Sequence, residues 1–405
     1  MAERAPTILQ IIPELDTGGA ELSTLEIAEA VIVAGGRAIV LTEGGRMLDR
    51  LKSLGTDVRI FPAATKNPLR LLANAVRIAS LVRRENVSLI HARSRAPAWS
   101  ALWAARMTGR PFITTYHGAY NETSAAKRFY NGVMARGDLV IANSGYTRDL
   151  VMSRYATPEA KIRVVHRGVD GNAFDPEAIA PGRVTRLRET WGLTNGERII
   201  LQAARLTNWK GQHTVVAAAR HLKDEGRPLK AVIVLAGDAQ GREGYATSLS
   251  DAIKAAGLEN QIRLVGHVDD MPAAFLAADL SIVASIEPEA FGRTAVESQA
   301  LGCPVIATRI GAPPETVCAA PDYGPDERTG WLVPPGDPEA LAAALEEAMA
   351  LPPEARAALG ARSRAHACGS FSLRQMRLKT LKVYDEILGT RLEAAYVAAR
   401  PQVHG

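Results

Sequence analysis

The chain has 405 residues, of which 47% are hydrophobic and 22% charged, as is usual for two or three soluble globular domains. Its three cysteines show no metal-ligand spacing, which argues against a disulfide framework and for a reducing compartment. No window approaches the roughly 20 apolar residues that a membrane span needs, and the first residues lack the apolar stretch of a signal peptide. We therefore expect a cytoplasmic protein.

The net charge of +5 is unevenly distributed along the chain. The first 175 residues carry +7 and the remainder carries −2. A basic first half suits an acidic partner such as anionic lipid, a phosphorylated glycan or nucleic acid. A basic surface that is merely solvated explains the same numbers equally well, so both interpretations stay open.

Short apolar runs alternate with helical patterns along the whole chain, which predicts parallel β-sheets covered by helices. The segment between His166 and Leu193 is rich in turn residues and is predicted to link two such domains. We expect a Rossmann-like N-terminal domain at residues 1–175, a Rossmann-like C-terminal domain at 188–370 and a helical tail at 371–405, with ligands in the crevice between the domains. The runs expected to form strands cover residues 7–13, 37–42, 87–92, 111–117, 138–144, 161–166, 198–203, 231–237, 262–266, 279–285 and 304–308.

Two features of the first half follow strand runs. Gly18 and Gly19 stand at the start of a helical pattern, where paired glycines permit either a close approach to a ligand or a plain tight turn. The surrounding residues do not form the dinucleotide pattern Gly-x-Gly-x-x-Gly. His117 closes the run PFITTYH, and a histidine in that position is either a hydrogen-bonded structural residue or a ligand contact.

Two cations, Arg205 and Lys210, follow the first strand run of the second half, within the sequence AARLTNWKGQ. The carboxyl ends of parallel strands face the ligand crevice, so both side chains are placed to bind a diphosphate on which negative charge develops. Charge-assisted hydrogen bonds contribute about 1.5–3 kcal/mol each. Two ordinary surface cations are the alternative.

The most informative stretch is ASIEPEAFGRTAVESQALGCPVIATRIGAPPETV, which begins at Ala284. Glu289 follows a buried strand run, and Glu297 lies on a helix expected to begin near Arg293. Such a unit offers an anion site and two carboxylates for hydroxyl groups, which is the distribution of groups on a nucleotide-diphosphate sugar. Otherwise the two glutamates are ordinary surface charges. The amides expected at the anion site belong to Gly292, Arg293 and Thr294.

This block, EAFGRTAVE, resembles the Glu–seven residues–Glu signature of glycosyltransferase family 4, and in particular bacterial lipopolysaccharide and cell-envelope glycosyltransferases. The family usually has glycine where this chain has Ala290 and Ala204. The sequences GGAE, ARLTNWKG and YHG match further family elements. The resemblance implies the α/β GT-B fold, in which two Rossmann-like parallel-sheet domains face a cleft and the last helix crosses back to the N-terminal domain. It also implies retention of the anomeric configuration.

The resemblance further implies a division of roles. The C-terminal domain would hold the nucleotide-diphosphate sugar and the N-terminal domain the acceptor. Glu297 would accept hydrogen bonds from the ribose and Glu289 from the sugar, while His117 would line the sugar side. Arg205 and Lys210 would neutralise the leaving diphosphate. The other residues expected to contact the donor are Gly18, Gly19, Phe291, Gly292, Arg293 and Thr294.

The acceptor is expected to be an envelope glycolipid or glycan, with the lipopolysaccharide core as the specific hypothesis, and no nucleic acid. No Asp-x-Asp occurs, and neither a metal ion nor another cofactor is expected. The helical run at residues 66–87, with Arg70, Arg77 and Arg84, either lies against anionic lipid or packs on the sheet with its arginines solvated. Two other classes remain: an NAD-dependent oxidoreductase, suggested by Glu43 after the second strand run, and a non-catalytic sugar-nucleotide-binding protein. The sequence does not distinguish a UDP-sugar from a GDP-sugar.

Overall fold

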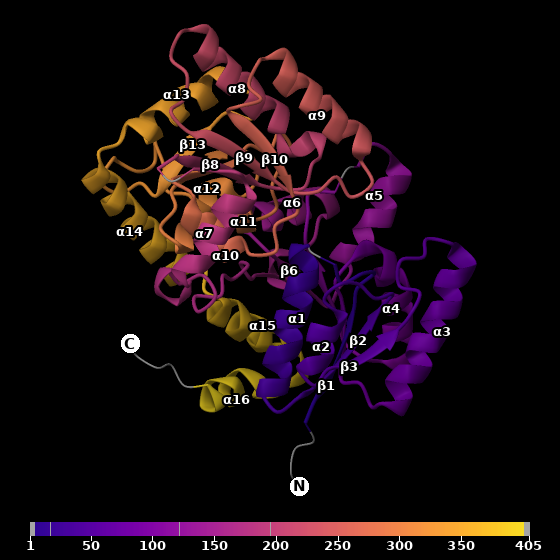
Figure 1. Ribbon diagram of the computed structural model, residues 1–405. Helices are drawn as coiled ribbons and strands as arrows, with labels where there is room; N and C mark the ends of the chain where they lie inside the picture. Colours follow the sequence, from indigo (N-terminus) through magenta and orange to yellow (C-terminus); the bar gives the residue numbers. More distant parts are fainter. Residues whose placement is uncertain (1–4, 17, 121, 195, 401–405) are drawn as a thin grey trace. The chain divides into compact units, whose positions relative to one another are not determined.

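Two parallel sheets, of seven and six strands, organise the chain, and helices pack on each of them (Figure 1). The chain divides into two compact units: unit 1 is Met1–Arg167 with Arg374–Gly405, and unit 2 is Gly168–Leu373. The predicted α/β class with two Rossmann-like parallel sheets is thereby confirmed. The structure is a computed structural model that describes residues 5–16, 18–120, 122–194 and 196–400.

The sheet of unit 1 has the order β3-β2-β1-β4-β5-β6-β7. Its interior strands are mostly apolar and are buried along their length, as expected where helices cover both faces of a parallel sheet. All six runs predicted in this half form strands. The prediction omitted β3, a partly exposed edge strand whose sequence DVRI is not a continuous apolar run. The strands are β1 (Thr7–Ile11), β2 (Arg37–Thr42), β3 (Asp57–Ile60), β4 (Leu89–Ala92), β5 (Phe112–Tyr116), β6 (Leu139–Ala142) and β7 (Ile162–Val164).

The end of the chain belongs to unit 1. Arg377 of α15 forms an ion pair with Glu29 of α1, and the Tyr384 hydroxyl lies 2.7 Å from Nδ1 of the buried His91. Figure 1 shows α15 and α16 in yellow beside the indigo α1. The expected return of the last helix to the N-terminal domain is therefore confirmed. The helices are α1 (Gly19–Val33), α2 (Leu48–Ser53), α3 (Pro68–Arg84), α4 (Arg95–Thr108), α5 (Ala125–Asn131), η1 (Gly132–Ala135), α6 (Gly145–Tyr155), η2 (Glu159–Lys161), α15 (Leu373–Leu388) and α16 (Leu392–Ala399).

The sheet of unit 2 has the order β10-β9-β8-β11-β12-β13. All five runs predicted in this half form strands. The prediction omitted β13, whose four residues follow a turn-rich segment and are too few to stand out as an apolar run. The strands are β8 (Ile199–Ala203), β9 (Val232–Ala236), β10 (Ile262–Gly266), β11 (Leu280–Val283), β12 (Val305–Thr308) and β13 (Gly330–Val333).

The segment predicted as a linker carries a helix, α7, and lies in unit 2. Arg183 of α7 donates to both carboxylate oxygens of Asp270, at 2.8 and 2.6 Å. Asp270 also caps α10 by accepting from the Ala273 amide. The helices are η3 (Pro176–Ala178), α7 (Pro181–Thr190), η4 (Asn208–Lys210), α8 (Gln212–Asp224), α9 (Glu243–Ala255), α10 (Met271–Ala277), α11 (Arg293–Ala300), α12 (Pro313–Thr316), α13 (Pro338–Ala350) and α14 (Pro353–Ser370).

In each sheet the strand order reverses beside the first strand of the unit. The reversal lies between β1 and β4 in unit 1 and between β8 and β11 in unit 2. Open α/β sheets bind ligands at this switch point, because the connections leave the two strand ends in opposite directions and a crevice remains. In the part of the chain that the structure describes, no helix is both long and apolar enough to cross a bilayer.

Candidate active site

Two loops meet at the switch point of unit 2. Trp209 and Lys210 lie in the loop after β8, and Ile286 lies in the loop after β11. The Ile286 amide donates to the Trp209 carbonyl at 2.9 Å. The side chain of Gln202, on β8, donates to the Lys210 carbonyl at 2.7 Å. These bonds fix the two loops to each other and to the sheet.

Gly211 lets the loops approach this closely. Its φ is +71°, a left-handed conformation that side chains disfavour, and a Cβ there would lie 1.9 Å from the Ala284 carbonyl oxygen. No other residue can occupy this position without separating the loop after β8 from the loop after β11. The glycine therefore fixes the position of the preceding Lys210.

Lys210 and Glu289 form an ion pair between Nζ and Oε1, and both side chains are mostly buried. The same carboxylate oxygen accepts from Ser285 Oγ at 2.5 Å, and Lys210 Nζ lies 4.1 Å from the centroid of the Trp209 ring. An ammonium group has three N–H bonds, so one bond to Glu289 leaves others for an anion. The structure thus joins two residues to which the sequence assigned separate contacts.

The backbone of Glu289 is held as firmly as its side chain. Its amide donates to the Ile310 carbonyl at 3.3 Å, and its carbonyl accepts from the Ala312 amide at 2.9 Å. The loop after β12 therefore supports the loop after β11 from the other side. This support was not predictable from the sequence, since the partners lie more than twenty residues farther along the chain.

Arg205 emerges from the same loop as Lys210 but is exposed. Its backbone carbonyl accepts from Gln212 Nε2 at 2.9 Å, and Gln212 Oε1 accepts from the Tyr245 hydroxyl at 2.9 Å. Within the described ranges the Arg205 side chain forms no ion pair, whereas its backbone is fixed. The guanidinium therefore stands at the strand end with its charge uncompensated by a carboxylate.

The turn before α11 is anchored in the core. Gly292 caps the helix in a left-handed conformation with φ of 80°, and no side chain caps the first turn. The buried Phe291 ring packs against Phe371, with 5.6 Å between ring centroids. Arg293 Nε donates to Glu297 Oε1 at 2.8 Å, one helical turn along. The helix begins at Arg293, as predicted, and its amino end lies in the loop that carries Glu289.

In unit 1, His117 is a neutral, partly buried hydrogen-bond donor. Arg167 donates to its Nδ1, and an arginine cannot accept, so the imidazole hydrogen is on Nε2. Burial, and after it the charge of Arg167, lowers the pKa of His117 well below its ordinary value. Nε2 has no hydrogen-bond partner among the residues described, so it can donate to a ligand oxygen.

Gly18 and Gly19 form the start of α1, as predicted, and Gly18 is its N-cap. A Cβ on Gly19 would meet nothing within 4 Å, whereas one on Gly18 would meet the carboxylate of Glu21 at 2.1 Å. The first turn thus has open space at Gly19. Thr17, which precedes the pair, lies outside the described residues.

The structure therefore gathers the predicted residues in two groups. In unit 2, the ends of β8 and β11 hold the cations and carboxylates together; in unit 1, the glycines follow β1 and His117 follows β5. Sequence reasoning missed Ser285, Trp209 and Arg167, which fix the predicted side chains. Ser285 ends a predicted strand run, and this was the only signal for it.

Two further expectations concern other chemistries. Glu43, considered as a ribose-binding acid, uses Oε1 to accept from the Ala64 amide at 2.8 Å. Among the described side chains, no group of three or more histidines, cysteines, aspartates or glutamates is arranged to hold a metal ion.

Two family models match the chain. Residues 184–366 match "Glycosyl transferases group 1", and residues 17–172 match "Glycosyltransferase Family 4". Together they extend from the start of α1 to α14. The first matched region contains the loops after β8 and β11, and the second contains the glycine pair and His117.

Related proteins are glycosyltransferases. The chain is 32% identical over 273 residues to D-inositol 3-phosphate glycosyltransferase of Saccharomonospora viridis. The aligned region covers 65% of this chain and 60% of that protein. It spans about 60% of the length of the first curated relatives that it matches. A glycosyltransferase crystal structure from Rickettsia africae is 34% identical with a TM-score of 0.85, covering 96% of this chain and 100% of that one.

Another solved structure is Anabaena Alr3699/HepE in complex with UDP-glucose, at 25% identity and a TM-score of 0.80, covering 94% of this chain and 99% of that one. The Rickettsia match extends over both units at an identity that unrelated chains do not reach. With the two family models and the paired Rossmann-like sheets, it shows that the chain belongs to glycosyltransferase family 4 and has the GT-B fold.

Proposed function

We propose that this chain transfers a sugar from a nucleotide-diphosphate sugar, a UDP- or GDP-sugar, to an envelope glycolipid or glycan, with retention of the anomeric configuration and without a metal ion or other cofactor. The observation that carries the proposal is the Lys210–Glu289 pair at the switch point of unit 2; Glu289 lies in the same loop as the amino end of α11, whose cap residue is Gly292. Cationic and anionic groups side by side suit a ligand that has both phosphates and hydroxyls. The UDP-glucose complex of the Anabaena relative supports the same donor class.

In the proposed reaction, the bond between the anomeric carbon and the phosphate oxygen breaks, and the leaving diphosphate takes the electron pair. The acceptor hydroxyl oxygen forms the new bond on the same face of the sugar. Its proton passes to the leaving phosphate, so no side chain is needed as a general base. The charge that grows on the diphosphate is the quantity that the protein has to stabilise.

Three positive groups are available for that charge. Lys210 keeps N–H bonds free while it is held by Glu289, and Arg205 is exposed without an ion-pair partner in the described ranges. The amino end of α11 adds the positive end of a helix dipole. Because Lys210 is fixed before the ligand arrives, it reaches the developing charge without a reorganisation cost.

The remaining predicted residues bind the donor by hydrogen bonds. Glu289 and Glu297 accept from sugar and ribose hydroxyls, and each is already oriented by a cation, Lys210 or Arg293. His117 donates through Nε2 to an oxygen of the transferred sugar. The backbone of Phe291, rather than its buried ring, is the part that contacts the donor. Gly18, Gly19, Gly292 and Thr294 offer amides to the diphosphate.

For the acceptor, we propose an anionic glycolipid or glycan at the inner face of the cytoplasmic membrane, with the lipopolysaccharide core as the specific candidate. The +7 charge of the first 175 residues supports an anionic acceptor. The Saccharomonospora relative is named D-inositol 3-phosphate glycosyltransferase, and this name supports a phosphate-bearing acceptor as well.

Binding and slow hydrolysis of sugar nucleotides test the proposal. We expect calorimetry with UDP-glucose, GDP-mannose and other sugar nucleotides to give one preferred donor, and the purified chain to hydrolyse it slowly without acceptor. NAD is the control ligand and should not bind. Binding without any hydrolysis or transfer would leave a sugar-nucleotide-binding protein, and NAD binding alone would contradict the proposal.

A further inference from the structure

Unit 1 contains a long segment with very little negative charge. Between residues 61 and 137 there are twelve lysines and arginines and only two acidic residues, Glu85 and Glu122. Glu85 forms ion pairs with Arg37 and Arg59, which both precede that segment. Glu122 accepts from the Tyr155 hydroxyl and forms an ion pair with Arg154 at 3.9 Å, outside that segment. The two acids thus have partners outside the segment, whose cations outnumber them six to one.

The first part of this surface is the outer side of α3. The helix packs on the core through residues such as Leu71 and Ile78, so the packed-helix interpretation of its sequence is confirmed. Three further apolar side chains point away from the core: Leu69 is 80% exposed, Leu72 56% and Val76 52%. Their spacing of three and four residues places them on one side of the helix. A soluble surface helix normally has polar residues there.

Cations surround this apolar stripe, and α3 contains no acidic residue. A helix with exposed aliphatic side chains and flanking arginines has the composition of helices that lie in the interface of an anionic membrane. The exposed cations on or next to α3 are Lys66, Arg70, Arg77, Arg83 and Arg84.

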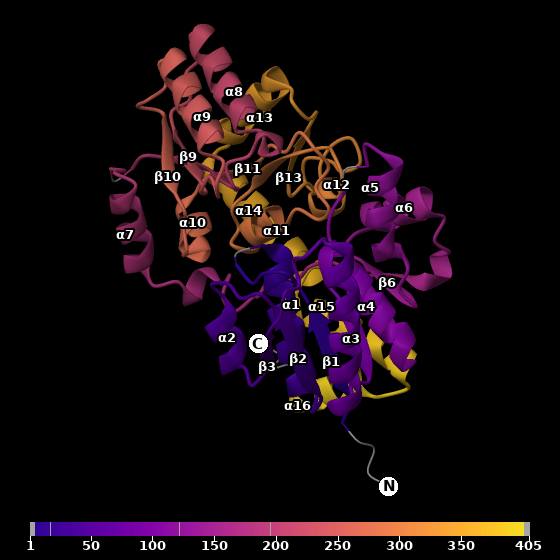
Figure 2. The same cartoon turned by 90° about the vertical axis from the view of Figure 1, so that its right-hand side faces the viewer.

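The surface continues across α4, which runs beside α3 (Figure 2). Ser100 Oγ of α4 donates to the Leu71 carbonyl of α3 at 2.8 Å, and Arg83 at the end of α3 donates to the Met107 carbonyl at the end of α4 at 2.7 Å. Met107 is itself exposed. The apolar and cationic character of α3 therefore extends to the end of α4.

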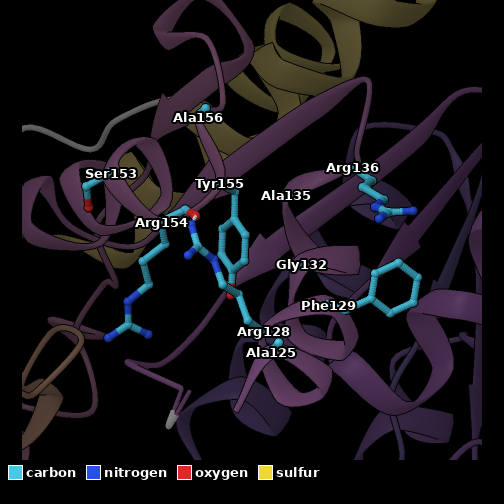
Figure 3. A pocket seen from close by; sticks show the side chains of 10 residues that line it. All are labelled: Ala125, Arg128, Phe129, Gly132, Ala135, Arg136, Ser153, Arg154, Tyr155 and Ala156. Atoms are coloured by element: carbon cyan, nitrogen blue, oxygen red, sulfur yellow. Dashed lines mark hydrogen bonds between the residues drawn. The ribbon is translucent and has the colours of Figure 1, made fainter. Parts of the chain in front are cut away.

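Two pockets belong to the same surface, and Arg136 lines both of them. The first, of about 470 Å³, is lined by Arg106 and Arg110 at the end of α4. The second, of about 510 Å³, is lined by Arg128 of α5 and Arg154 of α6 (Figure 3). Each pocket thus has three guanidinium groups among its lining residues, and the first also has one carboxylate, Asp138, which accepts from the Phe112 amide at 2.8 Å. A guanidinium matches a phosphate group in shape and charge.

Aromatic rings hold the shared arginine in place. The Arg136 guanidinium carbon lies 5.0 Å from the Trp99 ring centroid and 5.1 Å from that of Phe129. The Phe129 ring stacks on Trp99 and is 62% exposed. Figure 3 shows Arg136 and Phe129 on one side of the pocket and Arg154 on the other, with Tyr155 between them. An exposed aromatic ring thus lies next to a fixed cation.

We propose that this surface, the α3–α5 face, docks on an anionic lipid bilayer. Leu69, Leu72 and Val76 enter the boundary between headgroups and acyl chains, and the pockets on either side of Arg136 bind lipid phosphates. The exposed aliphatic stripe favours a bilayer over nucleic acid, which offers phosphates but no apolar layer. The inference deepens the proposed function by naming the surface that faces the membrane, and it can be tested without donor or acceptor.

Sedimentation with vesicles tests the docking. The full chain should bind vesicles of phosphatidylcholine with phosphatidylglycerol, bind pure phosphatidylcholine weakly, and lose binding as salt is raised. The double variant Arg128→Gln/Arg136→Gln should bind the anionic vesicles about 25-fold more weakly, since each cation near the surface is worth about fivefold. The triple variant Leu69→Gln/Leu72→Gln/Val76→Gln should lose a comparable part of its affinity for the vesicles, because it no longer buries these aliphatic side chains in the bilayer.

The control variants carry the same types of substitution, Arg→Gln and Leu→Gln, at exposed residues of unit 2, which lie outside the α3–α5 face. Arg186→Gln/Arg242→Gln removes two exposed arginines, and Leu264→Gln removes an exposed leucine. Both controls should bind anionic vesicles like the unaltered chain, and all variants should keep its melting temperature. Equal losses in the controls would show a net-charge effect and overturn the proposal.

Two other results would also overturn it. One is equal binding to neutral and anionic vesicles, or binding to neither. The other is tight binding to a DNA duplex that the triple apolar variant retains in full, because it would assign the α3–α5 face to nucleic acid. Donor hydrolysis by a variant that no longer binds vesicles would separate the failure of docking from a failure of the proposed transfer.

Discussion

Lys210 combines a fixed position with a free charge, and the two properties have different causes. Its backbone is fixed by Gln202 and by the contact of Gly211 with Ala284, whereas its ammonium group is held by Glu289. A cation fixed in this way loses little entropy when a phosphate arrives. The proposed chemistry therefore depends on this residue more than on the exposed Arg205.

The first prediction concerns this ammonium group. Lys210→Ala should lower the turnover number for sugar transfer by about 10²–10³, by analogy with the loss of one oxyanion donor. The Michaelis constant of the donor should change less, since the charge that Lys210 stabilises develops in the transition state. Steady-state kinetics with the preferred donor measure both values.

Lys230→Ala is the control, because Lys230 is an exposed lysine elsewhere in unit 2. It should have the turnover number of the unaltered chain. Full activity of Lys210→Ala would remove Lys210 from the mechanism.

The second prediction concerns His91, which is buried with both ring nitrogens in use. Nδ1 lies 2.7 Å from the Tyr384 hydroxyl and Nε2 lies 2.7 Å from Thr115 Oγ1. Burial, followed by the charge of Arg93, lowers the pKa of His91 well below its ordinary value of 6.5. Below pH 6.5 the unfolded chain binds a proton at His91 that the folded chain does not. The free energy of unfolding should therefore have its full value above pH 6.5 and fall as the pH drops below 6.5.

The slope from one such histidine reaches about 1.4 kcal/mol per pH unit. Urea unfolding between pH 7 and pH 5, compared for the unaltered chain and His91→Gln, measures it. The variant should be less stable at pH 7 but should lose less stability on acidification. Parallel pH dependences for the two chains would show that His91 does not carry this effect.

Among the elements, Gly211 in the loop after β8 and Gly226 in the turn after α8 are two glycines with nearly the same backbone conformation. Gly211 has φ of +71° and Gly226 has φ of +72°. A Cβ at Gly211 would lie 1.9 Å from the Ala284 carbonyl oxygen, whereas one at Gly226 would meet nothing within 4 Å. The pair therefore separates the cost of the conformation from the cost of the contact.

The third prediction uses this pair. Gly226→Ala should lower the free energy of unfolding by about 1–2 kcal/mol, the cost of a left-handed residue with a side chain. Gly211→Ala should cost about 1–3 kcal/mol more because of the overlap with Ala284, and it should also weaken donor binding, since Lys210 and Glu289 move apart. Urea unfolding and calorimetry with the donor measure the two effects. Equal losses in both variants would contradict the close packing of the two loops.

The elements also show what the sequence could predict. Interior strands such as β1, β5 and β11 are buried along their whole length and mostly apolar, because both faces of a parallel sheet are covered, and these were predictable. The strand β3 was not, because it is a partly exposed edge strand with two charged residues. The strand β13 is largely buried but short and follows a turn-rich segment, and it was missed as well. The strand-end positions of Lys210 and Glu289 followed from the same reasoning, but their ion pair did not. The ion pair joins residues 79 positions apart and depends on the pairing of β8 with β11.

On the scale of the whole molecule, the last segment of the chain completes the first unit. Leu381 and Tyr384 of α15 are fully buried, and Arg377 pairs with Glu29 of α1. Unit 1 is therefore built from both ends of the chain, with all of unit 2 inserted between them. A fragment that ends at residue 167 lacks side chains that belong to its own core.

The fourth prediction follows from this order of the chain. When residues 1–167 are co-expressed with residues 168–405, the two fragments should purify together in folded form, because α15 and α16 of the second fragment fill the core of the first. With residues 168–373 in place of 168–405, the first fragment should be recovered unfolded or insoluble, since the buried His91 then lacks Tyr384 and apolar surface stays open. Tyr384→Ala in the longer fragment should weaken the association without abolishing expression. Equal recovery of residues 1–167 with either partner would mean that α15 and α16 are dispensable, and that the insertion of unit 2 has no consequence for folding.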